Sequence, residues 1–141
     1  MRKKKRVLRN NPEKIPSKYR AKLSDAAKDM VVRQGEIMYI TMKDQDTSCT
    51  LDTNDIKLID ENMDAIYLWL DADYFKYPHV SNIINFKYIK EVVPKMEGLE
   101  VTMVDGKCLK VSKDDKNEFN IQYSLYLFMN RLKGVKGIVN N

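Results

Sequence analysis

The sequence has few of the residues on which catalytic and metal sites depend. Its 141 residues include one histidine and two cysteines, Cys49 and Cys108, which form no CxxC or Cys/His ligand cluster. With only five glycines, the chain also has no glycine-rich loop of the kind that binds phosphates. We therefore expect no metal, no cofactor and no enzymatic activity, and we interpret the two cysteines as free thiols in a reducing cytoplasm.

Long hydrophobic runs are also missing. No apolar stretch approaches the ~20 residues that a membrane-spanning helix needs. The basic opening Met1–Arg6 is typical of the start of a signal peptide, but no apolar segment follows it. We therefore expect a cytoplasmic protein without a membrane span. A hydrophobic content of 43% in 141 residues is enough for one domain with a core that needs no disulfides.

Charge is distributed unevenly along the chain. Residues 1–33 contain 12 Lys/Arg and three Asp/Glu, a net charge of +9, whereas residues 34–141 contain 13 and 17, a net of −4. A basic arm on a mildly acidic body is typical of a protein whose N-terminus contacts a polyanion. The alternative is a solubility tail that binds nothing specific. The acidic body argues against DNA binding, because phosphate neutralisation supplies most of the affinity.

The N-terminal region is predicted to contain an arm and one helix. Residues 1–14 have no apolar periodicity and are expected to be extended. Helical spacing begins at Ser17, and Gly35 is expected to close the helix in the left-handed conformation. The apolar positions of this helix are Tyr19, Leu23, Ala26 and Met30. Such a basic amphipathic helix fits the protein's own body, a partner or a membrane surface, and packing on the body is the default.

The centre of the chain is predicted to be mainly β. Strands are expected at 36–42, 48–51 and 56–59, with a polar turn at 43–47 between the first two. Asp60 is a favourable N-cap for a short helix over residues 61–70. The side chains of this helix expected to face the core are Met63, Ile66, Tyr67 and Leu70.

The C-terminal part is predicted to contain a hairpin and a helix. A strand over 86–92 is expected to stop at Pro94. Asp105-Gly106 predicts a two-residue turn that pairs Met103 with Cys108, which places apolar residues on both faces.

Ser112–Asp115 reads as a capping box that opens a helix to about Leu132, and Gly134 and Gly137 are expected to end it. We predict an arm and helix over 1–34, a body over 35–133 and a tail over 134–141.

The body also carries a recognisable motif. Residues 74–92 read YFKYPHVSNIINFKYIKEV, Val111-Ser-Lys113 follows, and Glu36–Ile40 precedes. This arrangement resembles the LytTR family of bacterial DNA-binding domains over residues 35–130. In that family an FFRxHRSxxVN segment leads into a strand, a hairpin and a VSR turn.

The resemblance implies a mainly β fold. Small antiparallel sheets are expected to stack in an elongated body, with a short middle helix, a C-terminal helix and an added N-terminal helix. Loops along one edge enter successive major grooves of duplex DNA. The family usually follows a phospho-receiver domain, which this sequence lacks, so we expect a stand-alone member.

The resemblance also implies which side chains contact DNA. The family's first contact turn falls on 43–48, its HRS triplet on 79–81, and the Arg of its VSR turn on Lys113. Val80 stands where the family has Arg or Asn, and we interpret Asn85 as a backbone-capping residue. The expected DNA-binding residues are Lys43, Thr47, Lys76, His79, Ser81, Asn82 and Lys113.

Two of these residues have alternative interpretations. His79 either bonds a phosphate or bonds its own scaffold. Lys113 is either a DNA contact at a loop tip or a solvated lysine beside Asp114 and Asp115.

These features predict a transcription regulator that binds a direct-repeat site in double-stranded DNA. A regulatory protein partner and a dimer on DNA are compatible with the sequence, which leaves the oligomeric state open. The alternative is a protein-binding module with degenerate DNA-reading loops, which engages an acidic partner through the basic arm. Docking of the arm on an anionic membrane is a third, weaker option, because no acyl anchor motif is present.

Overall fold

A computed structural model describes residues 23–79 and 81–140, without the side chains of His79 and of residues 133–140. The predicted arm over 1–14, the beginning of the predicted helix at Ser17 and the substituted position Val80 lie outside the described residues.

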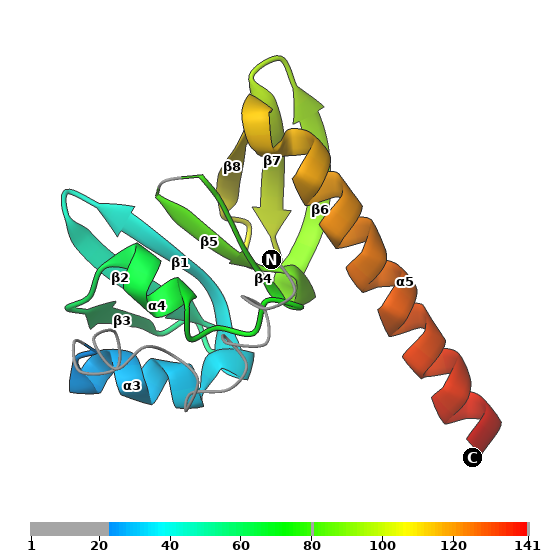
Figure 1. The fold of residues 1–141 in the computed structure, drawn as a ribbon, viewed down its shortest axis with the longest axis horizontal. Helices are drawn as coiled ribbons and strands as arrows, with labels where there is room; N and C mark the ends of the chain where they lie inside the picture. The colour runs from blue at the N-terminus through cyan, green and yellow to red at the C-terminus, as the bar shows by residue number, and fades with distance from the viewer. Residues whose placement is uncertain (1–22, 80, 141) are drawn as a thin grey trace.

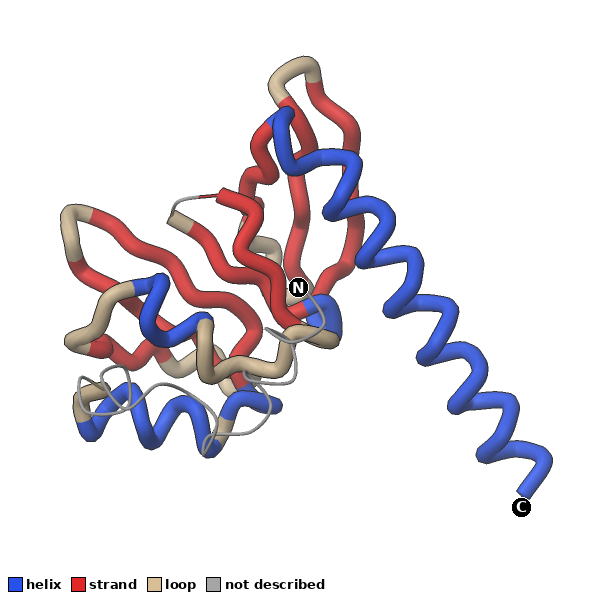
Figure 2. Tube along the Cα trace, in the orientation of Figure 1, coloured by secondary structure: helices blue, strands red, loops and turns tan. Residues whose placement is uncertain are grey.

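The described chain forms two antiparallel sheets with helices around them (Figure 1; Figure 2). The first sheet has the strand order β3-β2-β1-β5-β4, and the second has the order β6-β7-β8. The expected fold of small antiparallel sheets with a C-terminal helix is therefore confirmed. The strands of the first sheet are β1 (Ile37–Lys43), β2 (Asp46–Leu51), β3 (Ile56–Ile59), β4 (Phe75–His79) and β5 (Asn82–Asn85). Those of the second are β6 (Ile89–Lys95), β7 (Gly98–Met103) and β8 (Cys108–Ser112).

Strand β1 lies between two hydrophobic cores. Ile37 and Ile40 belong to the core under the helices, whereas Met38 and Tyr39 belong to the core shared with the second sheet. A register shift between Ile37 and Tyr39 accompanies this change of face. The continuous apolar run is thus explained by burial on both sides.

Helix α3 (Asp25–Val32) packs on the body, as expected. Leu23 and Ser24 are not helical, so the predicted helix is not continuous through them, because the Ser24 hydroxyl accepts a hydrogen bond from the Ala27 amide at 3.1 Å and caps α3. Ala27 is consequently buried and the predicted Ala26 is exposed. The expected left-handed cap at Gly35 is wrong, since Gly35 lies in the 3-10 turn η2 (Gln34–Glu36) and has no positive φ.

Helix α4 (Met63–Tyr67) is shorter than the predicted helix over 61–70. Its N-cap is Asn62, not Asp60, because the Asn62 side-chain oxygen accepts the Asp64 amide at 2.7 Å. The residues expected to face the core do so in three cases, and the fourth, Tyr67, is half-buried.

The strand predicted at 86–92 is divided. Residues Phe86–Tyr88 form the 3-10 turn η3, and only then does β6 begin. Pro94 does not stop β6, in which it pairs with Leu99. Proline is tolerated there because β6 is an edge strand, where a missing N–H costs no ladder bond.

The Asp105-Gly106 hairpin is present, but its register differs from the prediction by one residue. Thr102 pairs with Cys108, and the Gly106 amide donates to the Met103 carbonyl at 2.9 Å. Gly106 has φ +93°, so the loop is a three-residue turn that ends in a left-handed residue. This register gathers the apolar side chains on one face and corrects the expectation of two apolar faces. The buried residues are Leu99, Val101, Met103, Leu109 and Val111.

The C-terminal helix is longer than predicted. The 3-10 turn η4 (Lys113–Asp115) leads into α5 (Lys116–Asn140), which continues through Gly134 and Gly137. A helical glycine costs only about 1 kcal/mol and need not end a helix. The expected capping box is not formed, because the Ser112 hydroxyl donates to the Asp115 carboxylate at 2.7 Å. No helix within the described residues is long and apolar enough to cross a membrane.

Candidate nucleic-acid interface

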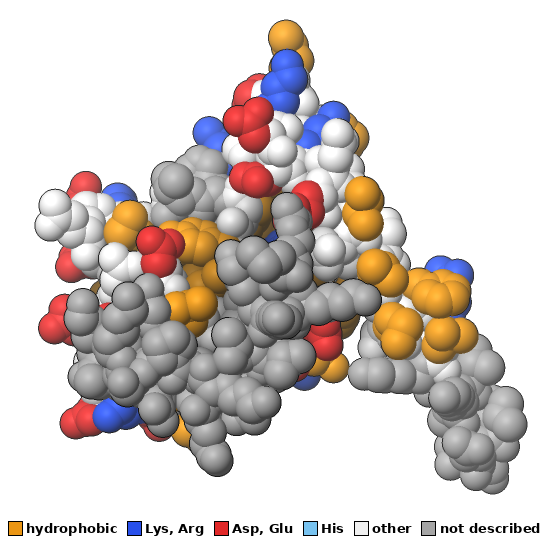
Figure 3. Space-filling model, in the orientation of Figure 1, with side chains coloured by type: hydrophobic (Ala, Val, Ile, Leu, Met, Phe, Trp, Pro, Cys, Tyr) orange, Lys and Arg blue, Asp and Glu red, His pale blue; other side chains and the backbone are white. Residues whose placement is uncertain are grey.

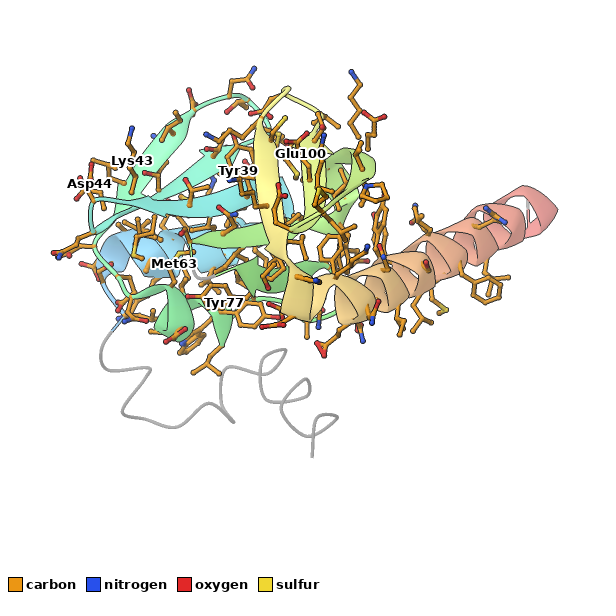
Figure 4. All side chains as sticks on the ribbon, turned by 90° about the horizontal axis from the view of Figure 1, so that it is seen from above. Tyr39, Lys43, Asp44, Met63, Tyr77 and Glu100 are labelled. Carbon is orange, nitrogen blue, oxygen red and sulfur yellow. The ribbon has the colours of Figure 1, made fainter. Side chains whose placement is uncertain are left out.

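The first predicted contact segment is a tight turn between β1 and β2. Asp44 and Gln45 have φ values of 50° and 71°, and Lys43 pairs with Asp46 across the hairpin. Two left-handed residues make a type I′ turn, so the observed turn is shorter than the turn predicted over 43–47. Lys43 is exposed at its base, and Figure 4 shows Lys43 and Asp44 at the rim of the body. Thr47, by contrast, lies inside β2 and is only 4% exposed.

The second segment joins β4 to β5. His79 pairs with Asn82, and a register shift between Lys76 and His79 accommodates the additional residue Pro78. The structure describes the backbone of His79 but not its side chain. Ser81 is half-buried, and its carbonyl accepts a hydrogen bond from the Met42 amide at 3.0 Å. The tip of this turn is therefore held against the end of β1.

Two residues predicted to contact DNA hold the scaffold together in this region. Asn82 is 8% exposed and donates its side-chain amide to the Lys110 carbonyl of β8 at 3.3 Å. The Lys76 ammonium lies 3.4 Å from the Glu118 carboxylate of α5, and its side chain is 20% exposed. Asn82 thus connects the two sheets, and Lys76 connects the first sheet to the helix.

The third segment is η4, which contains Lys113. Its side chain is exposed and neighbours the exposed Asp114 and Asp115. The backbone that leads into η4 is fixed by Gly98, which has φ +141°. A Cβ at Gly98 would lie 2.0 Å from the Val111 carbonyl oxygen.

Hydrogen bonds join the three segments along one edge. The Met42–Ser81 bond connects the first to the second. The Asn82 side-chain amide connects the second to β8, the strand that leads into the third, by its 3.3 Å bond to the Lys110 carbonyl. Figure 1 shows the β1–β2 and β4–β5 turns on the same side of the first sheet. We call this row of segments, 43–46, 78–82 and 112–115, the loop edge.

The loop edge carries charges of both signs. Acidic and basic side chains alternate around its tips and the neighbouring β6–β7 turn, and Figure 3 shows both colours intermixed at the top of the molecule. The exposed cations are Lys43, Lys95, Lys110 and Lys113, and the exposed anions are Asp44, Asp46, Glu97, Asp114 and Asp115. Within the described residues, then, this edge is not a positive patch. The net +9 of residues 1–33 is the largest concentration of positive charge in the sequence.

Sequence reasoning missed one exposed candidate on this edge. Gln45 occupies the tip of the first turn, where its exposed side chain has the donor and acceptor that can read adenine. Gln45 lies at the tip because the turn has only two residues. The length of the turn depends on the strand register, which composition does not reveal. Two exposed lysines near this edge were not predicted as contacts either: Lys110, which lies in a predicted strand, and Lys95, which follows the proline expected to end one.

Tyrosines anchor the body behind this edge. The Tyr39 hydroxyl donates to the Asp105 carboxylate at 2.7 Å and thereby ties β1 to the β7–β8 turn. Burial, reinforced by this carboxylate, raises the pKa of Tyr39 to about 12. Burial raises the pKa of Tyr77 and Tyr88 to about 12 as well, with Asp64 and Asp52 as the respective carboxylate neighbours. Among the described residues, no group of three His, Cys, Asp or Glu side chains could hold a metal ion.

Comparison with known proteins places this arrangement in context. A family model described as the LytTr DNA-binding domain matches residues 27–124. A similar solved structure is described as the LytTr DNA-binding domain of a methyl-accepting/DNA response regulator from Bacillus cereus. It is 22% identical, with a TM-score of 0.58, and the match covers 62% of this chain and 81% of that chain. No curated protein matches the chain.

Proposed function

The chain belongs to the LytTR family of DNA-binding domains, and from this premise we propose that it is a transcription regulator that binds duplex DNA sequence-specifically. The loop edge enters successive major grooves, and residues 1–33 supply affinity for the phosphate backbone that is independent of sequence. The preferred site is a short direct repeat, because the edge meets one face of successive helical turns.

The observation that carries this proposal is the hydrogen-bonded alignment of the three segments. Loops read bases with precision only when a rigid scaffold holds them. Here the Met42–Ser81 and Asn82–Lys110 bonds fix the spacing of the tips before DNA binds. An edge with pre-set spacing fits a groove at lower entropic cost than separate flexible loops.

The exposed and buried residues have different roles in this proposal. Lys43, Gln45 and Lys113 are exposed and have side chains that can meet base edges or phosphates. Asn82 and Lys76 support the edge from behind through their contacts with Lys110 and Glu118. His79 and Ser81 remain proposed contacts at the tip of the second turn.

A second function is favoured by the charge of the loop edge. An edge on which exposed acids outnumber exposed bases attracts phosphates weakly. Under this alternative the body no longer reads bases, and the basic N-terminal arm engages an acidic protein partner. Val80, at the position of the family's Arg, agrees with this alternative.

Selection from a pool of random duplexes at moderate salt separates the two functions. The proposed regulator enriches a motif that repeats in the same orientation at about 10–10.5 base pairs, one helical turn. The matched control is the Lys43→Ala, Gln45→Ala, Lys113→Ala triple variant, which should keep the wild-type circular dichroism spectrum but enrich no motif. Failure of the wild-type protein to enrich any motif would support the partner-binding alternative.

A further inference from the structure

Helix α5 has apolar side chains on two opposite sides. One side packs on the core shared with the second sheet, where the rings of Phe119, Tyr123 and Tyr126 contact Phe86. Their centroids lie 5.5–5.6 Å from that of Phe86. Successive helical residues are 100° apart, so a second apolar set faces away from the body. This set is exposed, and Figure 3 shows a hydrophobic patch on the helix where it leaves the body. Its residues and exposed fractions are Ile121 61%, Leu125 51%, Phe128 55% and Leu132 42%.

The spacing of this second set is that of a coiled-coil seam. The four residues follow one another at intervals of four, three and four, which is the a/d pattern of a heptad repeat. In the sequence the same pattern continues to Val135 and Val139. At 1.5 Å per residue the pattern from Ile121 to Val139 is ~27 Å long. We call the four exposed residues the α5 seam.

We propose that the α5 seam pairs with the α5 seam of a second copy of this chain. The distribution of charge along α5 indicates which partner the seam binds. From Phe119 to Asn130 the helix has no charged residue, although 32% of the chain is charged. An acidic or basic partner therefore finds no counter-charge along this stretch, whereas two identical copies meet there without like-charge repulsion. Helices that lie on membranes are rich in Lys/Arg on their polar face, which this stretch is not.

The area of the seam is sufficient for a reversible dimer. A large aromatic side chain buries ~150–250 Å² when fully covered, so each half-exposed large apolar side chain offers roughly 100 Å². The seam residues and the adjacent Met129, which is 50% exposed, then bury on the order of 1,000 Å² over two copies. This is near the lower limit for a specific interface, so the dimer forms in a concentration-dependent way.

The position of the helix leaves room for this pairing. The body packs on the side of α5 opposite to most of the seam, and Leu125 and Met129 border a groove between α5 and residues 73–74. Figure 1 shows the C-terminal half of the helix projecting from the body, on the far side from the β1–β2 turn. Two copies can therefore meet through α5 while the loop edge of each remains uncovered. The interface is isologous, with the same residues contributed by both copies.

Sedimentation of the full chain without DNA tests the proposal. Over total concentrations of roughly 5 to 200 µM, which bracket a micromolar dissociation constant, the weight-average mass should rise from that of a monomer toward that of a dimer. Leu125→Glu with Phe128→Glu should remain monomeric. The matched control, Asn120→Glu with Leu127→Glu, adds the same charge to exposed positions away from the seam and should dimerise as the wild type does.

Circular dichroism and thermal unfolding establish that each variant folds. If the two glutamates unfold the helix, the variant Leu125→Ala with Phe128→Ala is used in their place, because alanine favours helix. This alanine variant should raise the dimer dissociation constant at least tenfold. A wild-type protein that stays monomeric at every concentration overturns the proposal. Dimerisation that the seam variants do not weaken also overturns it, as does a monomer that binds anionic vesicles through Leu125 and Phe128. Because no DNA is present, the result is independent of the proposed regulator function.

Discussion

The side chains that the family resemblance assigns to DNA contact differ in burial and in structural role. Thr47 and Asn82 are buried, and Asn82 uses its amide to bond the neighbouring sheet. A buried polar group without its partner destabilises the fold by ~1–3 kcal/mol, so substitutions there act through folding. Lys43 and Lys113 are exposed, and substitutions there can change DNA binding alone.

Lys113→Ala separates folding from binding. Stability should change by no more than about 0.5 kcal/mol, as is usual for an exposed side chain. DNA affinity should fall by about 1–3 kcal/mol, with relaxed preference at one base pair, if Lys113 meets a guanine edge. Fluorescence anisotropy with the selected site and single-base variants measures both the affinity and the base preference, and urea unfolding measures the stability.

The matched control is Lys57→Ala, because Lys57 is an exposed lysine on β3, away from the loop edge. An equal decrease on all sequences would indicate a phosphate contact. Unchanged affinity together with a marked decrease in stability would show that Lys113 is structural.

Residue roles could be predicted from the sequence where local chemistry decides them. Asn85 was interpreted as a backbone-capping residue, and its side chain indeed accepts the Lys87 amide at 3.0 Å and donates to the Ile37 carbonyl at 2.8 Å. The burial of Thr47 could not be predicted in this way. It depends on where β2 begins, and the left-handed conformations of Asp44 and Gln45 set that point.

At the scale of elements, one glycine fixes the approach of β7 to η4. Gly98 has φ +141°, and its missing Cβ allows the Val111 carbonyl and the Lys113 amide to lie against it. The same approach positions the third segment of the loop edge. The geometry of that segment is therefore set from the neighbouring strand.

Gly98→Ala should destabilise the protein by about 2–4 kcal/mol, because a Cβ there meets backbone atoms and the backbone conformation is strained. Urea unfolding measures the change in stability. The control is Gly35→Ala, since a Cβ at Gly35 has nothing within 4 Å and its φ is not positive. Equal stability of the two variants would contradict the role given to Gly98.

Element boundaries were harder to predict than the elements themselves. The Asp105-Gly106 pair correctly indicated a hairpin, but the three-residue loop and its shifted register follow from the conformation of Gly106, which composition does not specify. In α5, Gly134 and Gly137 were read as an end signal. Glycine ends a helix only when it adopts the left-handed conformation, and here the helix continues.

At the scale of the whole molecule, tyrosine hydroxyls link segments that are distant in sequence. Tyr39 reaches Asp105, and the Tyr88 hydroxyl lies 2.7 Å from the Gly35 carbonyl and 3.1 Å from the Asp52 carboxylate. Such links were not predictable, because nothing local indicates which distant carboxylate a tyrosine meets. They make the assembled fold sensitive to the protonation of its phenols.

Stability should fall at alkaline pH. The folded pKa values of Tyr39, Tyr77 and Tyr88 are raised from 10.0 to about 12, with burial as the main cause. The folded state therefore holds these protons more tightly than the unfolded chain does. This stabilisation is complete below pH 10 and disappears as the pH rises from about 10 through about 12.

Urea unfolding at several pH values in this range, with phenolate absorbance followed in parallel, measures the effect. Tyr88→Phe is the control variant, because it removes one of the three groups and should flatten the decline. Phenolates that titrate at the ordinary value in the folded protein would contradict the prediction.

The division of charge between arm and body predicts how salt affects DNA binding. Residues 1–14 contain seven Lys/Arg and one Glu, a net of +6. Each phosphate that the protein neutralises adds about 0.9 to the slope of log affinity against log salt concentration, because binding releases a condensed counterion. Deleting residues 1–14 should therefore weaken binding to all duplexes alike and flatten this slope by roughly one unit for each phosphate that the arm neutralises.

A variant of full length with these cations changed to Gln should behave in the same way, which separates charge from chain length. The selected motif should stay the same in both variants, since the loop edge is intact. A slope equal to that of the wild type would place the arm away from the DNA and leave the body, with its net charge of −4 over residues 34–141, to supply the affinity.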